Sequence, residues 1–134
     1  MILIDTSAWI EYFRGTGSAA AVEVRRILSA EPDRVVICEP IAMEILAGAL
    51  DDERHAKLER LVTGLRSLRI DDALDFRSAA TIYRTARRTG QTIRSINDCL
   101  IAAVAIRHGA GIVHRDADFE VIATITGVDA RSFR

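Results

Sequence analysis

The stretch ILIDTSAWIEYF, residues 2–13, places three consecutive apolar residues directly before an acid, Asp5. A short apolar run of this kind is typical of a buried strand. Two hydroxyl residues, Thr6 and Ser7, come next, and a helical pattern continues over residues 8–14. In open α/β sheets, ligands bind beyond the carboxyl ends of the strands. The stretch therefore predicts a strand that delivers Asp5 to the functional edge of a sheet.

Short apolar runs alternate with longer helical patterns along the rest of the chain. They predict strands over residues 2–4, 34–38, 67–70, 111–114 and, more weakly, 128–131, and helices over 8–14, 18–29, 40–50, 53–65, 73–89, 96–108 and 117–125. Pro40 suits a first helical turn, and Asp71 or Asp72 suits a helix cap. Gly90 and Gly109 stand where helices should end. Strands separated by helices predict a parallel sheet that is covered on both faces.

The composition is that of an ordinary globular domain. The chain has 134 residues, a net charge of −1 and 49% hydrophobic residues, and this length suffices to bury a continuous core. No stretch approaches the length of a membrane span, and no secretory signal is visible, so we expect a cytoplasmic protein. Cys38 and Cys99 lie in apolar runs without metal-ligand spacing, and we predict reduced core residues. We expect residues 1–134 to form a single domain.

The segment PIAMEILAGAL, residues 40–50, contains a single polar side chain, that of Glu44. A helix that is apolar on every face is predicted to be buried on most sides. A buried carboxylate needs a counter-charge, good hydrogen bonds or a metal ion. The alternatives for Glu44 are a narrow exposed strip or an arginine partner.

The segment SINDCLIAAVAI, residues 95–106, carries one charge, that of Asp98. The spacing of Ser95 and Asp98 fits a capping box, and taken alone it favours a structural cap over a functional acid. Asn97 adds a second polar group at the same helix start.

In GIVHRDADFE, residues 111–120, a strand is followed by two acids, Asp116 and Asp118. Acids in a first helical turn are favoured by the helix dipole, which is the structural alternative here. One acid would satisfy that need, and the segment offers two.

The four segments together predict a metal site. Their carboxylates would repel one another at one sheet edge, and one or more would stay protonated at neutral pH. No lysine stands among them, because Lys57 is the only lysine in the chain. Mg²⁺ prefers oxygen ligands and is typically held by a few carboxylates together with phosphate oxygens. We therefore interpret Asp5 as a metal ligand, with Thr6 or Ser7 hydrogen-bonding the carboxylate or the substrate.

The same segments resemble PIN-domain ribonucleases, and specifically the VapC toxins of type II toxin–antitoxin systems. ILIDTSAWIEYF is similar to the first strand and acid of that family, and EPIAMEILAGA is similar to the segment with its second acid. INDCLIAAVAIRHGAGIVHRDADF is similar to its two C-terminal acid motifs. The resemblance covers essentially the whole chain. His114 departs from the pattern, because a small hydroxyl residue is common at that position in the family.

The resemblance implies a three-layer α/β/α sandwich and an endoribonuclease that depends on one or two Mg²⁺ or Mn²⁺ ions. Its implied catalytic and metal-binding residues are Asp5, Glu44, Asp98 and Asp116, with Asp118 as an adjoining ligand and Thr6, Ser7 and Asn97 in support. The expected substrate is structured RNA such as tRNA, and water attack on it would leave 5′-phosphate and 3′-hydroxyl ends. A cognate antitoxin would neutralise the enzyme, and a homodimer is expected.

Residues 76–97 contain five arginines and no acid, although the whole chain is almost neutral. An arginine-rich face suits a polyanion, whereas a solvated helix face is the plainer explanation. The candidates for RNA contact are Arg84, Arg87, Arg88, Arg94 and Arg115. By resemblance to VapC proteins, Trp9 and Tyr12 are candidates for an antitoxin or dimer interface, whereas Phe13 is expected in the core.

Two other functions remain open. The spacing of Asp116 and Asp118 invites comparison with the D-x-D-x-T motif of phosphatases, but Glu120 stands where threonine is required. A receiver-type phosphotransfer domain would need a paired acid at the first strand and a late lysine, and both are missing. A non-catalytic RNA- or protein-binding module of the same fold is the other alternative, and the complete set of acids argues against it.

Overall fold

The computed structural model describes residues 1–134 and contains one five-stranded, all-parallel sheet with the strand order β3-β2-β1-β4-β5. The strands are β1 (Ile2–Ile4), β2 (Val35–Ile37), β3 (Arg66–Ser67), β4 (Gly111–His114) and β5 (Ala130–Ser132). The first strand lies at the centre, where Leu3 is in register with Val36 on one side and with Ile112 on the other. The carboxyl ends of β1 and β4 are therefore neighbours.

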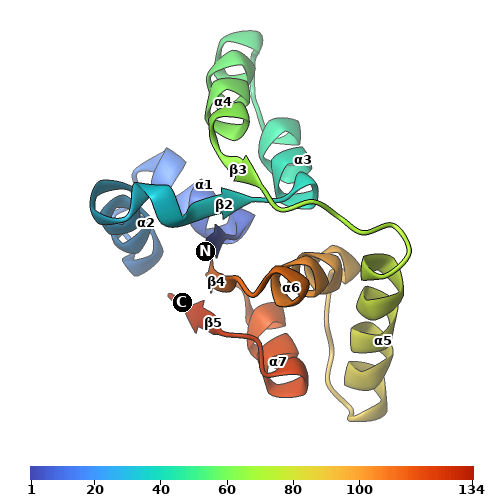
Figure 1. The fold of residues 1–134 in the computed structure, drawn as a ribbon. Coiled ribbons are helices and arrows are strands. Elements are labelled where there is room, and N and C mark those ends of the chain that lie inside the picture. Colours follow the sequence, from blue (N-terminus) through green and yellow to red (C-terminus); the bar gives the residue numbers. More distant parts are fainter.

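Seven α-helices and one short 3₁₀ turn connect the strands. They are α1 (Thr6–Arg14), α2 (Ala19–Ala30), η1 (Pro32–Arg34), α3 (Glu39–Ala47), α4 (Asp52–Gly64), α5 (Asp75–Arg88), α6 (Ile96–His108) and α7 (Ala117–Thr126). Helices α1 and α2 cover one face of the sheet, and α5 and α6 cover the other (Figure 1). This arrangement confirms the predicted three-layer α/β/α sandwich with a parallel sheet.

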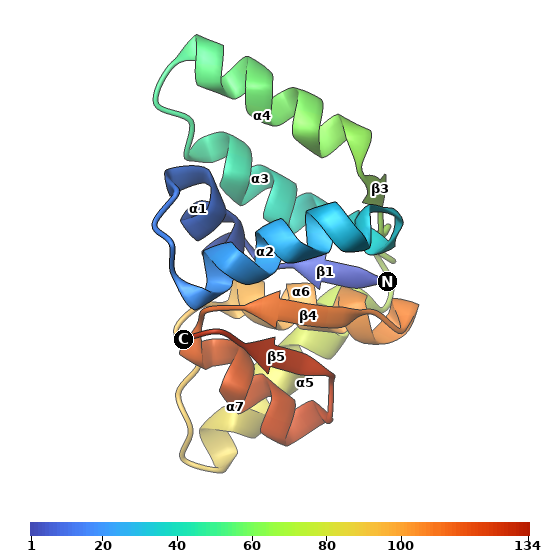
Figure 2. The same cartoon turned by 90° about the vertical axis from the view of Figure 1, so that its left-hand side faces the viewer.

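Helices α3 and α4 form a hairpin at the β3 edge of the sheet, with α4 outermost (Figure 2). The prediction that α3 is buried on most sides is wrong. Met43 is 59% exposed, and Leu50, just beyond the helix, is 81% exposed. The helix buries Ile41 and Ile45, whereas Met43 faces solvent. On its outer side only α4 packs against the helix, and α4 does not cover Met43.

The central strands supply the middle of the hydrophobic core. Leu3, Ile4, Ile37 and Val113 are almost completely buried, and the buried apolar residues form one continuous cluster. Burying an aliphatic side chain of this size contributes about 1.5–3 kcal/mol to the free energy of folding. Packing of these side chains therefore holds the central strands, and the residues that follow them, in place. Both predicted core thiols, Cys38 and Cys99, are buried and unpaired. None of the helices has the length and apolar content needed to cross a membrane.

Several helix boundaries follow from identifiable caps. Gly109 ends α6 in the left-handed conformation, with φ of 70°, which glycine adopts without steric cost. Asp71 accepts hydrogen bonds from the backbone of Ala73 and Leu74, and the resulting turn delays the start of α5 to Asp75. Asp72, the other predicted cap, makes no such bond. Gly90 lies one residue beyond the C-cap Thr89.

Candidate active site

Five acids approach one another at the carboxyl edge of the sheet. Asp5 follows β1, Glu44 lies on α3, Asp98 lies in the first turn of α6, and Asp116 and Asp118 begin α7. Carboxylate oxygens of Asp98, Asp116 and Asp118 lie within 4.8 Å of one another. Asp5 interacts electrostatically with Asp98, Asp116 and Glu44, so it belongs to the same cluster.

The cluster contains strongly perturbed carboxyl groups. Burial raises the pKa of Asp5 to about 6, and the charges of Glu44 and Asp116 add to this effect. Burial, reinforced by the charge of Asp5, raises the pKa of Asp98 to about 9. The pKa of Glu44 is also raised, first by burial and then by the charge of Asp116. Without a cation, the protein thus holds protons in this cluster near neutral pH.

Asp5 is held by the first turn of α1. It is the N-cap of that helix, and its Oδ2 accepts hydrogen bonds from the backbone N–H of Ser7 at 3.0 Å and from Ser7 Oγ at 2.5 Å. Ser7 Oγ also accepts a hydrogen bond of 2.9 Å from the backbone N–H of Arg115. Ser7 therefore ties the end of β1 to the segment that follows β4.

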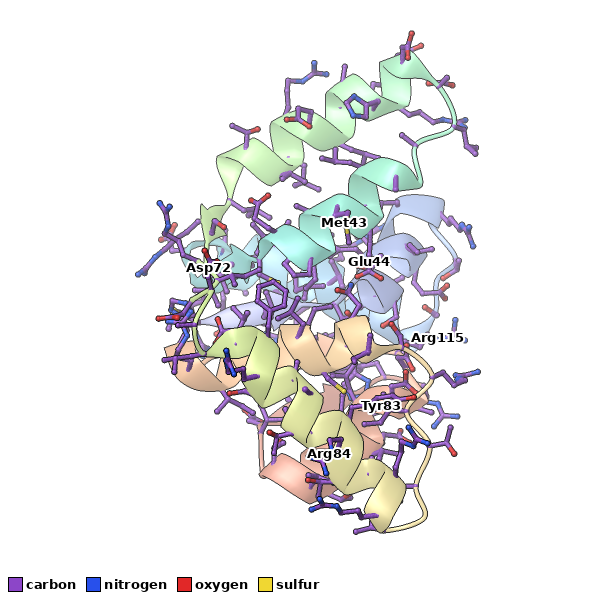
Figure 3. The ribbon with its side chains drawn as sticks, turned by 90° about the vertical axis from the view of Figure 1, so that its right-hand side faces the viewer. Met43, Glu44, Asp72, Tyr83, Arg84 and Arg115 are labelled. Atoms are coloured by element: carbon purple, nitrogen blue, oxygen red, sulfur yellow. The ribbon has the colours of Figure 1, made fainter.

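Glu44 is held from two directions. Thr6 Oγ1 donates a hydrogen bond of 3.1 Å to Glu44 Oε1. The side chain of Asn97 on α6 also opposes the rise of the Glu44 pKa. Figure 3 shows Glu44 and Arg115 on the same side of the molecule. The two hydroxyl residues after Asp5 thus serve different acids, Ser7 the first and Thr6 the second.

The predicted capping box of α6 is not formed. Ser95 is the N-cap residue, but its side chain makes no capping hydrogen bond, and Oδ2 of Asp98 is buried without a partner. The cap fails because the backbone N–H groups of Arg94 and Ser95 both donate to Asp118, at 3.0–3.1 Å. Asp98 is consequently 5% exposed and faces the other acids instead of its own backbone.

Asp116 and Asp118 divide two tasks. Asp116 is the N-cap of α7 and accepts the backbone N–H of Asp118 through Oδ1 at 2.9 Å, as the structural alternative for this acid pair expected. Asp118 is 3% exposed, and both of its oxygens already accept backbone hydrogen bonds. Asp116 therefore caps α7, and Asp118 anchors the loop before α6. Both residues also contribute carboxylate oxygens to the acid cluster.

The donors fit a hard divalent cation. Oδ1 of Asp5 and Oδ2 of Asp98 are buried and have no hydrogen-bond partner, although a buried carboxylate oxygen costs free energy when unpaired. All the converging ligand atoms are carboxylate oxygens, which Mg²⁺ and Mn²⁺ prefer. The nearest positive group is Arg94, whose side chain is 77% exposed and lies 4.0 Å from Asp116 and 3.9 Å from Asp118. Such an exposed pair contributes little compensation.

His114, whose role the sequence left open, is the last residue of β4 and is fully buried. Its Nδ1 accepts a hydrogen bond of 3.1 Å from the backbone N–H of Asp116, and its ring packs 5.3 Å from the ring of Phe119. Burial lowers its pKa, so the ring is neutral at neutral pH. A buried ring of this kind does not reach substrate.

The predicted arginines are placed differently from one another. Arg94 and Arg115 lie beside the acids, but Arg115 is also held by Glu11 at 2.7 Å. Arg84 lies on α5, away from Glu44 (Figure 3). Arg87 lies 5.9 Å above the ring of Tyr83, and Arg88 is exposed at the end of the same helix. None of the α5 arginines makes an ion pair with an acid of the cluster.

The two predictions for aromatic residues near Asp5 need correction. Trp9 is completely buried and stacks on Phe13 with ring centroids 5.5 Å apart, so the prediction of Trp9 as an interface anchor is wrong. Phe13, expected in the core, is 39% exposed because it lies on the outer side of α1 near its end. Tyr12 is half-buried and lines a cavity of about 220 Å³ between α1 and α2.

Comparison with known proteins agrees with this geometry. The PIN domain family matches residues 2–125. The chain is 75% identical to Ribonuclease VapC11 of Mycobacterium tuberculosis over 134 residues, which is the full length of both chains. Its fold is similar to that of a DNA-bound VapBC from Salmonella typhimurium, with a TM-score of 0.78, 20% identity, and coverage of 99% of this chain and 98% of the other. A toxin–antitoxin complex from Klebsiella pneumoniae has a TM-score of 0.74, 19% identity, and coverage of 100% and 98%.

Proposed function

This chain belongs to the PIN-domain family, in its VapC group, and on that premise we propose that it is a metal-dependent endoribonuclease and the toxin of a type II toxin–antitoxin pair. The proposal takes residues 1–134 as one domain that contains the whole catalytic centre. The observation that carries it is the convergence of buried carboxylates whose free oxygens, Asp5 Oδ1 and Asp98 Oδ2, have no partner in the protein.

Asp5, Asp98 and Asp116 would hold Mg²⁺ or Mn²⁺ directly, and Glu44 would complete the set from the more open side. When bound, such an ion lowers the pKa of a coordinated water and stabilises charge on phosphate oxygens. Asp118 lies close enough to contribute, although both of its oxygens already serve the loop before α6.

The protein's own groups orient the reaction. Ser7 fixes the rotamer of Asp5, and Thr6 and Asn97 fix Glu44, so the acids keep their places before substrate arrives. Arg94 is exposed beside the acids and is positioned to bind an RNA phosphate. The more distant arginines of α5 would extend this basic surface along the bound RNA. Hydrolysis by water would leave 5′-phosphate and 3′-hydroxyl ends and would not require the ribose 2′-hydroxyl.

The direct test is cleavage of RNA by the purified protein with Mg²⁺, with Mn²⁺ and with EDTA. We expect cleavage with either metal and none with EDTA. Asp5→Asn and Asp98→Asn should lower the rate by at least about a hundredfold, because each removes a charged ligand. Asp72→Asn is the matched control, since Asp72 is exposed and lies away from the cluster (Figure 3).

Mapping the cleaved ends separates the possible functions. Ends with 5′-phosphate that require both metal and Asp98 support the proposal. Equal cleavage by the wild type and by both Asn variants would contradict it. Tight RNA binding without any cleavage would identify a non-catalytic binding module, and release of phosphate from small phosphomonoesters would identify a phosphatase.

The toxin role predicts a protein partner. Expression of the wild type should arrest growth, and Asp98→Asn should not. Co-expression of a small protein encoded beside this one should restore growth. We also propose that the chain forms a homodimer, for which sedimentation of the purified protein is the measurement. Tyr12, at the cavity between α1 and α2, is the remaining aromatic candidate for contact with the antitoxin.

A further inference from the structure

Three backbone N–H groups of the turn that carries Asp116 donate hydrogen bonds to side chains. The N–H of Arg115 donates to Ser7 Oγ, that of Asp116 donates to His114 Nδ1, and that of Asp118 donates to Asp116 Oδ1. Oδ1 of Asp116 is engaged within the turn, and a carboxylate oxygen of the same residue lies within 4.8 Å of those of Asp98 and Asp118. The backbone of Asp116 is therefore bonded to the side chain at position 114.

The bond to Asp116 also defines the tautomer of His114. Because Nδ1 accepts a hydrogen, the neutral ring must carry its own hydrogen on Nε2. Nε2 is buried and has no partner. A buried N–H group without a partner lowers stability, so an imidazole is an unfavourable side chain for filling this space.

An aliphatic residue would fill the same position without that cost. The preceding residues of β4, Ile112 and Val113, are buried and apolar, and the ring of His114 packs on Phe119 as an apolar residue would. The contact that an aliphatic residue would lack is the hydrogen bond to the backbone of Asp116.

We propose that His114 is a positioning residue, whose Nδ1 holds the backbone of Asp116 so that its carboxylate is directed at the cation. The inference rests on the proposed function, in which Asp116 is a ligand. Without the bond, the turn between β4 and α7 relaxes, and the cation binds more weakly. Loss of an outer partner of a metal ligand typically lowers metal affinity or activity about 10–100-fold.

Two amide substitutions distinguish this role from simple packing. In His114→Asn, Oδ1 occupies the position of Nδ1 along the side chain and can accept from Asp116. In His114→Gln, Oε1 corresponds to Nε2 and lies beyond that N–H. Both bury an amide of similar polarity, so a packing role predicts similar effects from both. His114→Leu removes the acceptor altogether.

The measurement is titration of each protein with Mn²⁺ alone by calorimetry, together with melting in EDTA. We expect His114→Asn to bind Mn²⁺ within about threefold of the wild type, and the Gln and Leu variants to bind at least about tenfold more weakly. Equal Mn²⁺ affinity in the folded Asn and Gln variants would overturn the proposal. A wild type that binds Mn²⁺ but cuts no RNA would instead count against the proposed function.

The tautomer provides a test that needs no substitution, in case the variants do not fold. In the wild type, a long-range ¹H–¹⁵N spectrum of ¹⁵N-labelled histidines should show one ring with a bare Nδ1 and a protonated Nε2 that is protected from exchange. The exposed His55 and the partly exposed His108 serve as internal references. A protonated Nδ1 on the protected ring would overturn the proposal.

Discussion

The hydroxyl of Thr6 on α1 donates a hydrogen bond of 3.1 Å to Glu44 on α3, and so links the end of β1 to the helix that follows β2. Thr6 directly follows the first acid, Asp5, and is itself 7% exposed. A residue that directly follows one acid in the sequence therefore orients another acid.

Thr6→Val tests this contact, because valine keeps the shape of threonine and removes the donor. We expect cleavage at limiting Mg²⁺ to fall by about tenfold, since Glu44 loses the hydrogen bond that holds its side chain. The free energy of unfolding, measured in denaturant, should fall by about 1 kcal/mol. Thr6→Ser keeps the hydroxyl and should retain most of the activity, and equal losses in both variants would argue against the hydrogen bond.

The pH dependence of stability follows from the raised pKa values of Asp5, about 6, and Asp98, about 9. The unfolded chain releases these protons near pH ~4, whereas the folded protein retains them. Stability in EDTA is therefore greatest at low pH as far as these groups are concerned, and it falls as the pH rises through 6 and towards 9.

Melting of the protein in EDTA across this range measures the effect. Asp98→Asn should flatten the curve between pH 6 and 9, because the group with the higher pKa is gone. Added Mg²⁺ should raise the wild-type melting temperature most at the alkaline end, since the ion binds the charged form. A wild type that grows steadily more stable up to pH 9 would contradict the assigned shifts.

Asp118 should matter more to stability than Asp116. Asp118→Ala strands the backbone N–H groups of Arg94 and Ser95, and we expect a loss of about 2–3 kcal/mol in the free energy of unfolding. Asp116→Ala removes a helix cap and should cost about 1 kcal/mol. Denaturant unfolding compares them directly, and the reverse order would show that the anchor assignment is wrong.

The ion pair of Arg107 and Asp75 should be structural. Asp75 is 1% exposed and accepts two hydrogen bonds from the guanidinium, at 2.9 and 2.8 Å. Arg107→Leu leaves this carboxylate unpaired and should cost about 3 kcal/mol. Arg77→Leu, an exposed change on α5, the helix of Asp75, should alter stability by less than about 0.5 kcal/mol.

Metal-dependent cleavage supplies the second measurement for this pair. Both arginines lie outside the acid cluster, so each folded variant should cut RNA at close to the wild-type rate. A large loss of cleavage in folded Arg107→Leu would show that this ion pair also supports the active site.

The fold was predictable because its local signals agree with one another. The predicted limits of β4 and α6 coincide with the observed ones, since an αL glycine ends the helix and a buried apolar run marks the strand. The predicted strand over 67–70 is observed as Arg66–Ser67, although Leu68 is buried. An edge strand pairs on one side only, so its length depends on its neighbour and not on its own pattern.

The approach of the acids was also predictable, because parallel strands end at a common edge. The hydrogen-bond partners of these acids could not be predicted. Asp118 anchors residues 24 positions earlier in the chain, and no local spacing reveals such a contact. The same limit explains the failed capping box at Ser95, whose N–H donates to the distant Asp118. It also explains the exposed apolar side of α3, because composition alone does not show which face of a helix packs against the rest of the protein.

The central position of β1 has a consequence for biosynthesis. The strand that carries Asp5 is translated first, yet one of its two neighbours in the sheet, β4, is translated after the first six helices. A nascent chain that ends before residue 111 lacks both that neighbour and the last of the four acids, Asp116. A partial chain therefore contains the complete set of four acids only once all but its last 18 residues have been translated, and the order of synthesis itself delays the assembly of the acid cluster.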